Sequence, residues 1–342
     1  MKNAKEYFNS GGEKFVLEDY IGAIADLTIV IEIDPTIKVA YFNRGLSYAR
    51  LNQRDKAIAD FTKVIQIDPD YAEAYYFRGS SFGFLNKEEQ AIVDYTRAIK
   101  IDPTYVVAYY SRGLSYSKLN HWEKAITDYT KVIQIDPDYA EAYYYRGLSY
   151  LNLGQWEKAK ADYTEVIEID PNYADAYDDR GLSYVKLQQW EKAISDYTKV
   201  IQFDPQNADA YYFRGCSYTN LGHWEKAKAD YTKVIQLDPQ NADAYLNCGR
   251  CYSVEKDYDK AIVQFNRCLE INNNIWEATL GLALSYYYKD DNVNAKKYFE
   301  KSKTLESRLN KGMKGIAELE KEGSFFPYEE KQTLKKMFSE LN

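Results

Sequence analysis

The stretch TKVIQIDPDYAEAYY occupies residues 62–76, and the same fifteen letters return at residues 130–144. In a compact globular core each position faces different neighbours and therefore selects a different side chain, so a long verbatim copy has no structural reason there. In a stack of equivalent units each copy meets the same surroundings, and such a copy is expected. The question is therefore whether the rest of the chain keeps the same period.

Prolines mark a regular period along the chain. They fall at residues 35, 69, 103, 137, 171, 205 and 239, each thirty-four residues after the last, and Asn273 stands where the next would be. With each proline taken as position 32 of a repeat, position 8 is glycine from Gly11 to Gly249 and position 20 is alanine from Ala23 to Ala295. Position 24 is aromatic in every repeat after the first. The two copies of the opening stretch are thus two repeats apart, and a fixed period of this length is typical of a repeat array.

These positions resemble the tetratricopeptide repeat, a 34-residue helix-turn-helix, over residues 4 to about 305. The resemblance implies an all-α fold, a right-handed superhelical solenoid of nine helix-turn-helix repeats whose first helices line a concave groove. It also implies a function in binding segments of other proteins. We expect two parts, a tandem repeat array at residues 1–305 and C-terminal capping helices at residues 306–342.

The residues themselves also favour two amphipathic helices per repeat. In residues 208–239, ADAYYFRGCSYTNLGHWEKAKADYTKVIQLDP, small and apolar side chains recur every three to four positions on both sides of NLGHW. A helix of about a dozen residues is marginal alone and must bury one face on its neighbours. The small residues at positions 8 and 20 let the two helices approach closely, and the proline ends the second helix. The tryptophans at position 17 are expected to cover the turn: Trp122, Trp156, Trp190 and Trp224.

Composition narrows the classes of function. The chain has 342 residues, a net charge of −8 and a pI near 5.1. An acidic chain lacks the basic field that phosphate backbones attract, so nucleic acid is not expected as a partner. No apolar run of the sequence is long enough for a membrane span, and the first residues lack the apolar stretch of a signal peptide. We therefore expect a cytoplasmic location, unless a leader was removed.

No catalytic or metal-binding constellation is recognisable in the sequence. Cys248 and Cys251 form a CxxC pair, but no second pair and no nearby histidine completes a zinc site, so both are expected to be ordinary helix residues in a reducing compartment. The histidines, His121 and His223, fall at position 16, in the turn between the helices. The sequence has no glycine-rich phosphate loop or nucleophile elbow, and about 37 residues after the array cannot hold a catalytic domain. We expect no enzymatic activity, no cofactor and no metal.

The first helix of each repeat has two different faces. Positions 4, 7, 8 and 11 hardly vary, which predicts the core side, whereas positions 2, 5, 9, 12 and 13 lie nearly opposite and vary. Part of the burial at positions 5 and 9 is expected to be packing between neighbouring first helices, and the rest an apolar binding groove. The polar residues at position 13 suit hydrogen bonds to a peptide backbone, and solvated surface is the alternative. The candidate binding residues are Phe42, Tyr76, Tyr110, Tyr144 and Tyr212 at position 5 and Lys118, Asn152, Lys186 and Asn220 at position 13.

The sixth repeat interrupts the aromatic row. Its AYDDRG segment places Asp178 and Asp179 beside Asp175, with Asp209 expected on the next first helix. These carboxylates predict an acidic node that anchors a lysine, an arginine or a free amine of the partner. One subclass of the family binds a C-terminal carboxylate through Lys and Asn at positions 5 and 9, but aromatic and aliphatic residues dominate there, so that mode of binding is not expected.

A regular set of charges is assigned to packing. Arginine recurs at position 7 from Arg44 to Arg214, and aspartate recurs at position 23 from Asp26 to Asp230. A buried charge must be paired. Each arginine is therefore expected to meet the aspartate of its own repeat or of the preceding one, and either scheme leaves one aspartate without an arginine.

The residues after the array predict two further helices. Residues 305–323 and 328–342 each read as an amphipathic helix, with GSFFP as a turn between them. Phe325 and Phe326 are expected to tuck this cap onto the last repeat. Alternatively, the final helix swings away, or into a groove, as a regulatory or dimerising element.

The sequence therefore predicts a non-catalytic scaffold that binds a peptide or protein segment, including segments with basic groups, in the concave groove. The alternative is a self-associating assembly protein, in which the apolar groove or the C-terminal helix forms a homodimer. Light scattering separates the two, because a monomer at every concentration argues for a different protein as partner.

Overall fold

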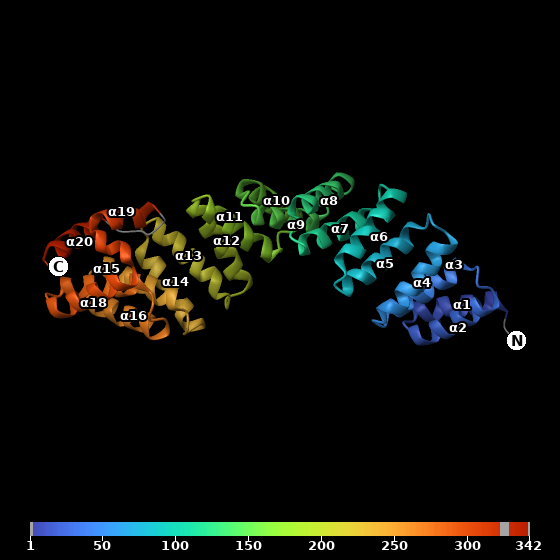
Figure 1. Cartoon of the computed structure of the whole chain (residues 1–342), viewed down its shortest axis with the longest axis horizontal. Coiled ribbons are helices and arrows are strands. Elements are labelled where there is room, and N and C mark those ends of the chain that lie inside the picture. Colours follow the sequence, from blue (N-terminus) through green and yellow to red (C-terminus); the bar gives the residue numbers. More distant parts are fainter. Residues whose placement is uncertain (1–2, 322–327, 341–342) are drawn as a thin grey trace. The chain divides into compact units, whose positions relative to one another are not determined.

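The computed structural model describes residues 3–321 and 328–340, and helices are the only regular elements in that part of the chain (Figure 1). Helices of 13 and 14 residues alternate up to residue 305. They are α1 (Ala4–Val16), α2 (Tyr20–Ile33), α3 (Lys38–Arg50), α4 (Arg54–Ile67), α5 (Ala72–Phe84), α6 (Glu88–Ile101), α7 (Val106–Lys118), α8 (Trp122–Ile135), α9 (Ala140–Asn152), α10 (Trp156–Ile169), α11 (Ala174–Lys186), α12 (Trp190–Phe203), α13 (Ala208–Asn220), α14 (Trp224–Leu237), α15 (Ala242–Val254), α16 (Tyr258–Ile271), α17 (Trp276–Tyr288) and α18 (Asn292–Leu305). The short 3₁₀ helix η1 (Ser307–Lys311) and the helices α19 (Met313–Lys321) and α20 (Tyr328–Glu340) follow.

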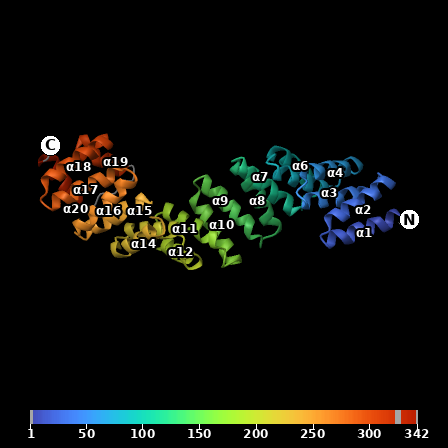
Figure 2. The ribbon, with the colours of Figure 1, turned by 90° about the horizontal axis from the view of Figure 1, so that it is seen from below.

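Each odd-numbered helix up to α17 forms a helix-turn-helix repeat with the helix after it, so the described residues contain nine repeats. Packing divides the chain into two units, residues 1–176 and 177–342, with the boundary inside α11. Within the first unit, neighbouring helices from α1 to α10 pack on one another in chain order, and within the second unit neighbouring helices from α12 to α18 do the same (Figures 1 and 2). The predicted all-α repeat fold is confirmed.

A residue with a left-handed backbone makes the turn inside each repeat. Position 15 has a positive φ in all nine described repeats, from Glu18 (61°) to Asp290 (60°). In the fourth repeat the N–H of His121 donates to the carbonyl of Tyr116 at 2.8 Å, which satisfies one of the last carbonyls of α7. Five of the nine residues at position 15 are asparagine or glycine, the residues that tolerate this conformation best.

The proline ends the second helix of the repeat as predicted. In the third repeat α6 stops at Ile101, and Asp102, which precedes Pro103, is extended with φ −121° and ψ 97°. The carboxylate of Asp102 then accepts the N–H and the O–H of Thr104 at 2.8 and 2.7 Å. The chain is thereby turned toward the first helix of the next repeat.

The core of a repeat lies between small side chains of its first helix and an aromatic ring of its second. In the fourth repeat Ala108 and Gly113 are buried on α7, and Tyr129 is fully buried on α8. A Cβ added to Gly113 would lie 2.7 Å from the Tyr129 ring. The glycine at position 8 therefore lets the two helices approach, as predicted.

The buried stripe of the first helix is narrower than the sequence predicted. The alanine at position 3 and the serine at position 10, such as Ala108 and Ser115, are the buried residues beside the glycine. Most of the tyrosines at position 4 are only half buried, and those of the second to seventh repeats contact the arginine at position 7, as Tyr109 does with Arg112 at 5.6 Å from the ring centre. Close helix contact favours the small side chains, so the large aromatic rings of positions 4 and 11 lie at the edge of the core.

The arginines and aspartates pair within each repeat. Arg146 donates two hydrogen bonds to the carboxylate of Asp162, at 2.8 and 2.7 Å, and a third to the hydroxyl of Thr130 in the preceding repeat at 3.1 Å. The other pairs are Arg44 with Asp60, Arg78 with Asp94, Arg112 with Asp128, Arg180 with Asp196 and Arg214 with Asp230. Asp26 of the first repeat binds Lys14 at 2.7 Å instead. The own-repeat scheme is thus the one observed, and a threonine supplies the link to the preceding repeat.

The last described helix, α20, lies on the first helix of the ninth repeat. Leu334 and Met337 of α20 are fully buried in one cluster with Leu280 and Leu284 of α17. Tyr287 of α17 donates its hydroxyl to the carboxylate of Glu340 at 2.6 Å. Leu280, Leu284 and Tyr287 stand at positions 5, 9 and 12, the face predicted to form a groove. The final helix therefore packs on the last repeat and covers part of that face. Its roles as a cap or as a regulatory element stay predictions, and the contacts predicted for Phe325 and Phe326 fall outside the described residues.

Candidate functional site

The candidate residues at position 5 are half buried in packing between helices. Tyr110 lies against Tyr129 and Tyr139, with ring centroids 6.1 and 5.2 Å apart, and against Tyr145 of the next repeat at 6.0 Å. Burial raises the pKa of Tyr110. The equivalent rings of Phe42, Tyr76, Tyr144 and Tyr212 also contact the position 24 ring of their own repeat. Position 5 thus contributes to stacking of the repeats, and a contact of these rings with a ligand stays a prediction.

The candidate residues at position 13 are exposed. Asn152 and Asn220 each donate a side-chain amide N–H to a carbonyl of their own helix, at 2.8 and 2.9 Å. Lys186 is exposed on α11. Lys118 pairs with Glu88 of the preceding repeat at 2.8 Å. The structure therefore places Lys118 on a charged group of the preceding repeat.

The predicted acidic node divides into exposed and half-buried groups. Asp175 and Asp209 are exposed, whereas Asp178 and Asp179 are half buried. Burial and the negative charges of Asp178 and Asp179 raise the pKa of Tyr197 on α12. These two aspartates thus lie near a buried phenol, and anchoring of a basic partner group there stays a prediction.

A regular contact joins position 17 of one repeat to position 13 of the next. The guanidinium of Arg54 lies 4.0 Å from the ring centre of Phe84, and the rings of Tyr258 and Tyr288 stack at 4.8 Å. The ion pair of Glu88 and Lys118 is the same contact in the third and fourth repeats. We call these the rim pairs. In the fifth repeat position 17 also covers the turn as predicted, because a Cβ on Gly154 would lie 3.7 Å from the Trp156 ring.

The first helices of the third, fourth and fifth repeats, together with residues of the second helices α6 and α8, line a pocket of about 660 Å³. All of its lining residues lie in the first unit, and many stand at positions 6, 9, 12, 13 and 17 of their repeats. They include Ser80, Phe84, Glu88, Ser111, Leu114, Lys118, Trp122 and Tyr145. We call this the Glu88 pocket. Its residues at positions 9, 12 and 13 belong to the variable face that the sequence predicted to be the binding side, whereas those at positions 6, 17 and 24 lie outside that set.

A missing ring creates the Glu88 pocket. At position 6, Phe77 and Tyr145 stack on Phe61 and Tyr129 of the preceding repeats, with centroids 5.9 and 6.1 Å apart. In the fourth repeat Ser111 takes that position and leaves the space beside Tyr95 open to the pocket. Burial raises the pKa of Tyr95, so its hydroxyl stays protonated at neutral pH.

Glu88 is the most deeply buried charged group of this pocket. The residue is 6% exposed, and its Oε1 accepts a hydrogen bond from Lys118 at 2.8 Å. Its Oε2 is buried, and no donor in the described part of the chain lies within hydrogen-bonding distance of it. The sequence prediction missed Glu88, Ser111 and Ser80. The available signal was a carboxylate at position 17, where the next four repeats carry tryptophan, beside serines at positions that are aromatic or leucine in neighbouring repeats.

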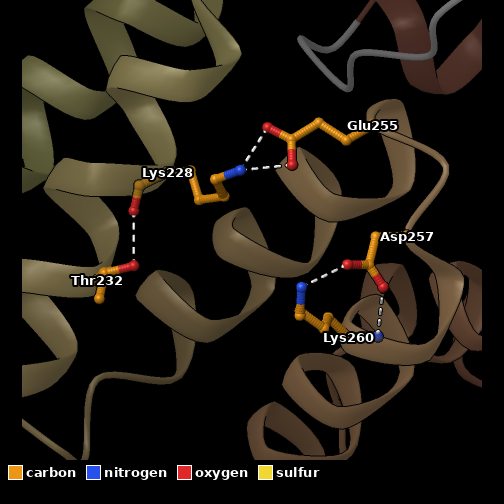
Figure 3. A network of polar contacts seen from close by, with 5 residues as sticks. All are labelled: Lys228, Thr232, Glu255, Asp257 and Lys260. Atoms are coloured by element: carbon orange, nitrogen blue, oxygen red, sulfur yellow. Dashed lines mark hydrogen bonds and ion pairs between the residues drawn. The ribbon is translucent and has the colours of Figure 1, made fainter.

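The cysteines take part in packing between repeats. All four are free thiols, and burial raises the pKa of Cys248 to about 11 and of Cys251 to about 12. Cys248 and Cys251 lie on α15 and pack against Tyr231 of α14. An ion pair of Lys228 and Glu255 at 2.6 Å also joins α14 to the end of α15, and Lys260 binds Asp257 nearby at 2.7 Å (Figure 3). Protonated, buried thiols beside a structural ion pair are poor nucleophiles.

Within residues 3–321 and 328–340, no three His, Cys, Asp or Glu side chains form a group that could hold a metal ion. No helix in that part of the chain combines the length and the apolarity needed to span a bilayer.

Two sequence profiles of repeat proteins match the chain. The profile described as tetratricopeptide repeat matches residues 39–71, 140–173, 208–241 and 242–275, and the profile described as TPR repeat matches residues 85–120, 115–154 and 181–222. Together these ranges cover more than half of the chain. The chain belongs to the tetratricopeptide repeat (TPR) family. No curated protein sequence matches it.

Solved structures share the TPR fold. The C-terminal part of a TPR repeat-containing protein from Cytophaga hutchinsonii matches with a TM-score of 0.62 and 20% identity, over 69% of this chain and 97% of that one. YrrB, a TPR protein with an unusual peptide-binding site, matches with a TM-score of 0.51 and 24% identity, over 54% of this chain and 95% of that one. A tetratricopeptide repeat protein from Parabacteroides merdae has a TM-score of 0.50 and 19% identity, over 72% and 98% of the two chains. At these identities the likeness supports the fold.

Proposed function

We propose that this TPR protein is a non-catalytic scaffold that binds a peptide or protein segment on the variable face of its first helices. The observation that carries the proposal is the position of α20. This helix places Leu334 and Met337, one turn apart, on Leu280 and Leu284 at positions 5 and 9 of the ninth repeat. The chain thus uses this face to hold an amphipathic helix of its own, which is a known mode of peptide recognition.

The same face has the properties of a binding surface in the first unit. Positions 6, 9 and 13 of the third to fifth repeats line the Glu88 pocket, where apolar walls surround a few polar groups. Ligand sites commonly have this composition. A net charge of −8 favours a segment with basic groups. YrrB, which shares the fold, is described as having a peptide-binding site, and we extend that kind of ligand to this chain.

Selection of peptides on the full chain tests the proposal. A phage-displayed library of random peptides is panned against the protein, and the dissociation constants of the selected peptides are measured by calorimetry. Leu114→Glu places a charge on the half-buried wall of the pocket, and Val93→Glu makes the same change at an exposed site of α6. We expect Leu114→Glu to weaken binding at least about tenfold, because an unpaired charge would be desolvated, and Val93→Glu to leave it unchanged.

Two results would contradict the proposal. One is a selection that yields no specific peptide, and the other is a set of peptides whose affinity responds equally to both variants. Circular dichroism of both variants controls for folding. Light scattering of the full chain tests the alternative, because a dimer that dissociates on dilution would favour self-association.

A further inference from the structure

We propose that the Glu88 pocket takes an arginine side chain, whose guanidinium replaces Lys118 on the carboxylate of Glu88. The inference rests on the proposed function, since the arginine is part of the bound segment. It names the group that this part of the face recognises.

The carboxylate of Glu88 has one oxygen, Oε2, for which the described residues supply no hydrogen-bond donor. The carboxylate is already desolvated, at 6% exposure, so a ligand does not have to remove its water. Lys118 donates to Oε1, and no described residue donates to the buried Oε2. A buried acceptor without a donor is unfavourable, so a ligand that supplies one gains more than it would on a hydrated carboxylate.

A guanidinium satisfies this carboxylate better than an ammonium does. Arginine presents two parallel N–H groups that bind both oxygens of a carboxylate, whereas lysine acts as a point charge. Since Oε2 is buried, the carboxylate must turn about its last torsion to receive such a fork, and that torsion is soft in glutamate. The present lysine contact uses only Oε1.

Lys118 can leave Glu88 at low cost. Its side chain is 58% exposed at the mouth of the pocket, so its ammonium regains water when it moves away. The arginine that takes its place keeps the buried carboxylate of Glu88 paired, so the exchange leaves no buried charge without a partner. Lys118 therefore acts as a weak internal competitor, holding the negative charge of Glu88 until a better donor arrives.

The walls of the pocket also suit a guanidinium. Trp122, Tyr145 and Phe84 contribute aromatic rings, on which a planar cation can stack. The chain makes this contact itself at the neighbouring rim pair, where Arg54 lies 4.0 Å from the ring centre of Phe84. The hydroxyls of Ser80 and Ser111 are acceptors for the remaining N–H groups.

Small probes test the inference without a peptide. N-acetyl-arginine amide, N-acetyl-lysine amide and N-acetyl-citrulline amide, which keeps the shape of arginine without its charge, are titrated into the full chain and followed by NMR. We expect arginine to bind at least about tenfold more tightly than citrulline, because a charged hydrogen-bonded pair is lost in the neutral analogue, and more tightly than lysine. Filling the pocket with Ser111→Tyr, which restores the ring found at Tyr145, should abolish arginine binding.

Variants of the rim pair give opposite effects. Glu88→Gln should weaken arginine binding at least about tenfold, and the exposed neighbour Glu89→Gln should leave it unchanged. Lys118→Met should strengthen it, because the internal competitor is gone. A purely structural role of the Glu88 and Lys118 pair would instead predict that both variants act in the same direction.

Equal binding of the arginine and citrulline probes, equal binding of arginine and lysine, or no effect of Glu88→Gln would overturn the inference. Its failure is distinguishable from failure of the proposed function. Selected peptides that respond to Leu114→Glu but not to Glu88→Gln would refute the arginine site alone. Peptides that ignore Leu114→Glu would refute the proposed function, whatever the small probes show.

Discussion

Replacing Arg146 with methionine should destabilise the fifth repeat by about 3 kcal/mol. Arg146 donates two hydrogen bonds to Asp162 and one to Thr130, and the two charged side chains are only 16% and 7% exposed. Methionine fills part of the space but leaves a buried carboxylate without its cation. Breaking such a pair costs about 3–5 kcal/mol, and we take the lower end because Asp162 can relieve the charge by binding a proton.

The effect of pH on this variant has a defined sign. Burial raises the pKa of Asp162 even with its arginine present, and removal of the arginine raises it further. An aspartate whose pKa is higher in the folded than in the unfolded state stabilises the fold at low pH and loses that stabilisation as the pH rises. The difference between the variant and the parent chain should therefore be largest near neutral pH and shrink toward pH 4.

Two assays measure the effect. The melting temperature should fall by several degrees, and hydrogen exchange should lose protection mainly in α9 and α10, because each repeat contacts only its neighbours. The control is Lys260→Met, which removes a pair with Asp257 whose side chains are 63% and 34% exposed and should cost at most about 0.5 kcal/mol. The double variant Arg146→Met with Asp162→Leu should regain most of the loss. An unchanged melting temperature, or a loss equal to that of the control, would refute the reasoning.

Two further predictions follow from the packing. Gly113→Ala would place a Cβ 2.7 Å from the fully buried Tyr129 ring and should lower the free energy of unfolding, measured in urea, by about 1–3 kcal/mol. The control is Gly12→Ala, whose Cβ would meet no neighbouring helix or side chain within 4 Å and which should stabilise its helix. Equal effects of the two variants would contradict the close approach of the helices at Gly113. Burial raises the pKa of Glu330 on α20 to about 7. The packing of α20 should therefore be most stable below the ordinary glutamate pKa of 4.5 and should lose stability as the pH rises through 7. Hydrogen-exchange protection factors of α20 at pH 5.5 and pH 8 measure this loss. The variant Glu330→Gln should show the same protection at both pH values, whereas equal protection in the parent chain would contradict the prediction.

The repeat fold could be predicted from sequence because every repeat meets the same surroundings. The glycine at position 8, the alanine at position 20 and the proline at position 32 each act locally, so their roles can be inferred from one repeat and checked in the others. The arginine and aspartate pairs were recognisable for the same reason. Their partner scheme was not, because sequence spacing alone does not say whether position 7 faces position 23 of its own repeat or of the preceding one.

The candidate site was predicted less completely, because it depends on departures from the repeat. Ser111 matters because a ring is missing between Tyr95 and Tyr145, and that space is defined by three repeats together. A glutamate at position 17 reads as a solvated charge in an isolated helix, and only its neighbours show that Glu88 is buried. Likewise, the amphipathic pattern of α20 predicted a helix but not the face on which it lies.

The most direct test of the central claim is a hydrogen-exchange footprint of the full chain with a peptide from the display selection at saturation. If the first helices form most of the binding face, exchange should slow most in α5, α7 and α9. In α6 and α8 it should slow mainly near Glu88 and Trp122, which also line the Glu88 pocket, and it should slow least in α10. Slowing confined to the second helices of these repeats, or no slowing in residues 72–169, would contradict the account.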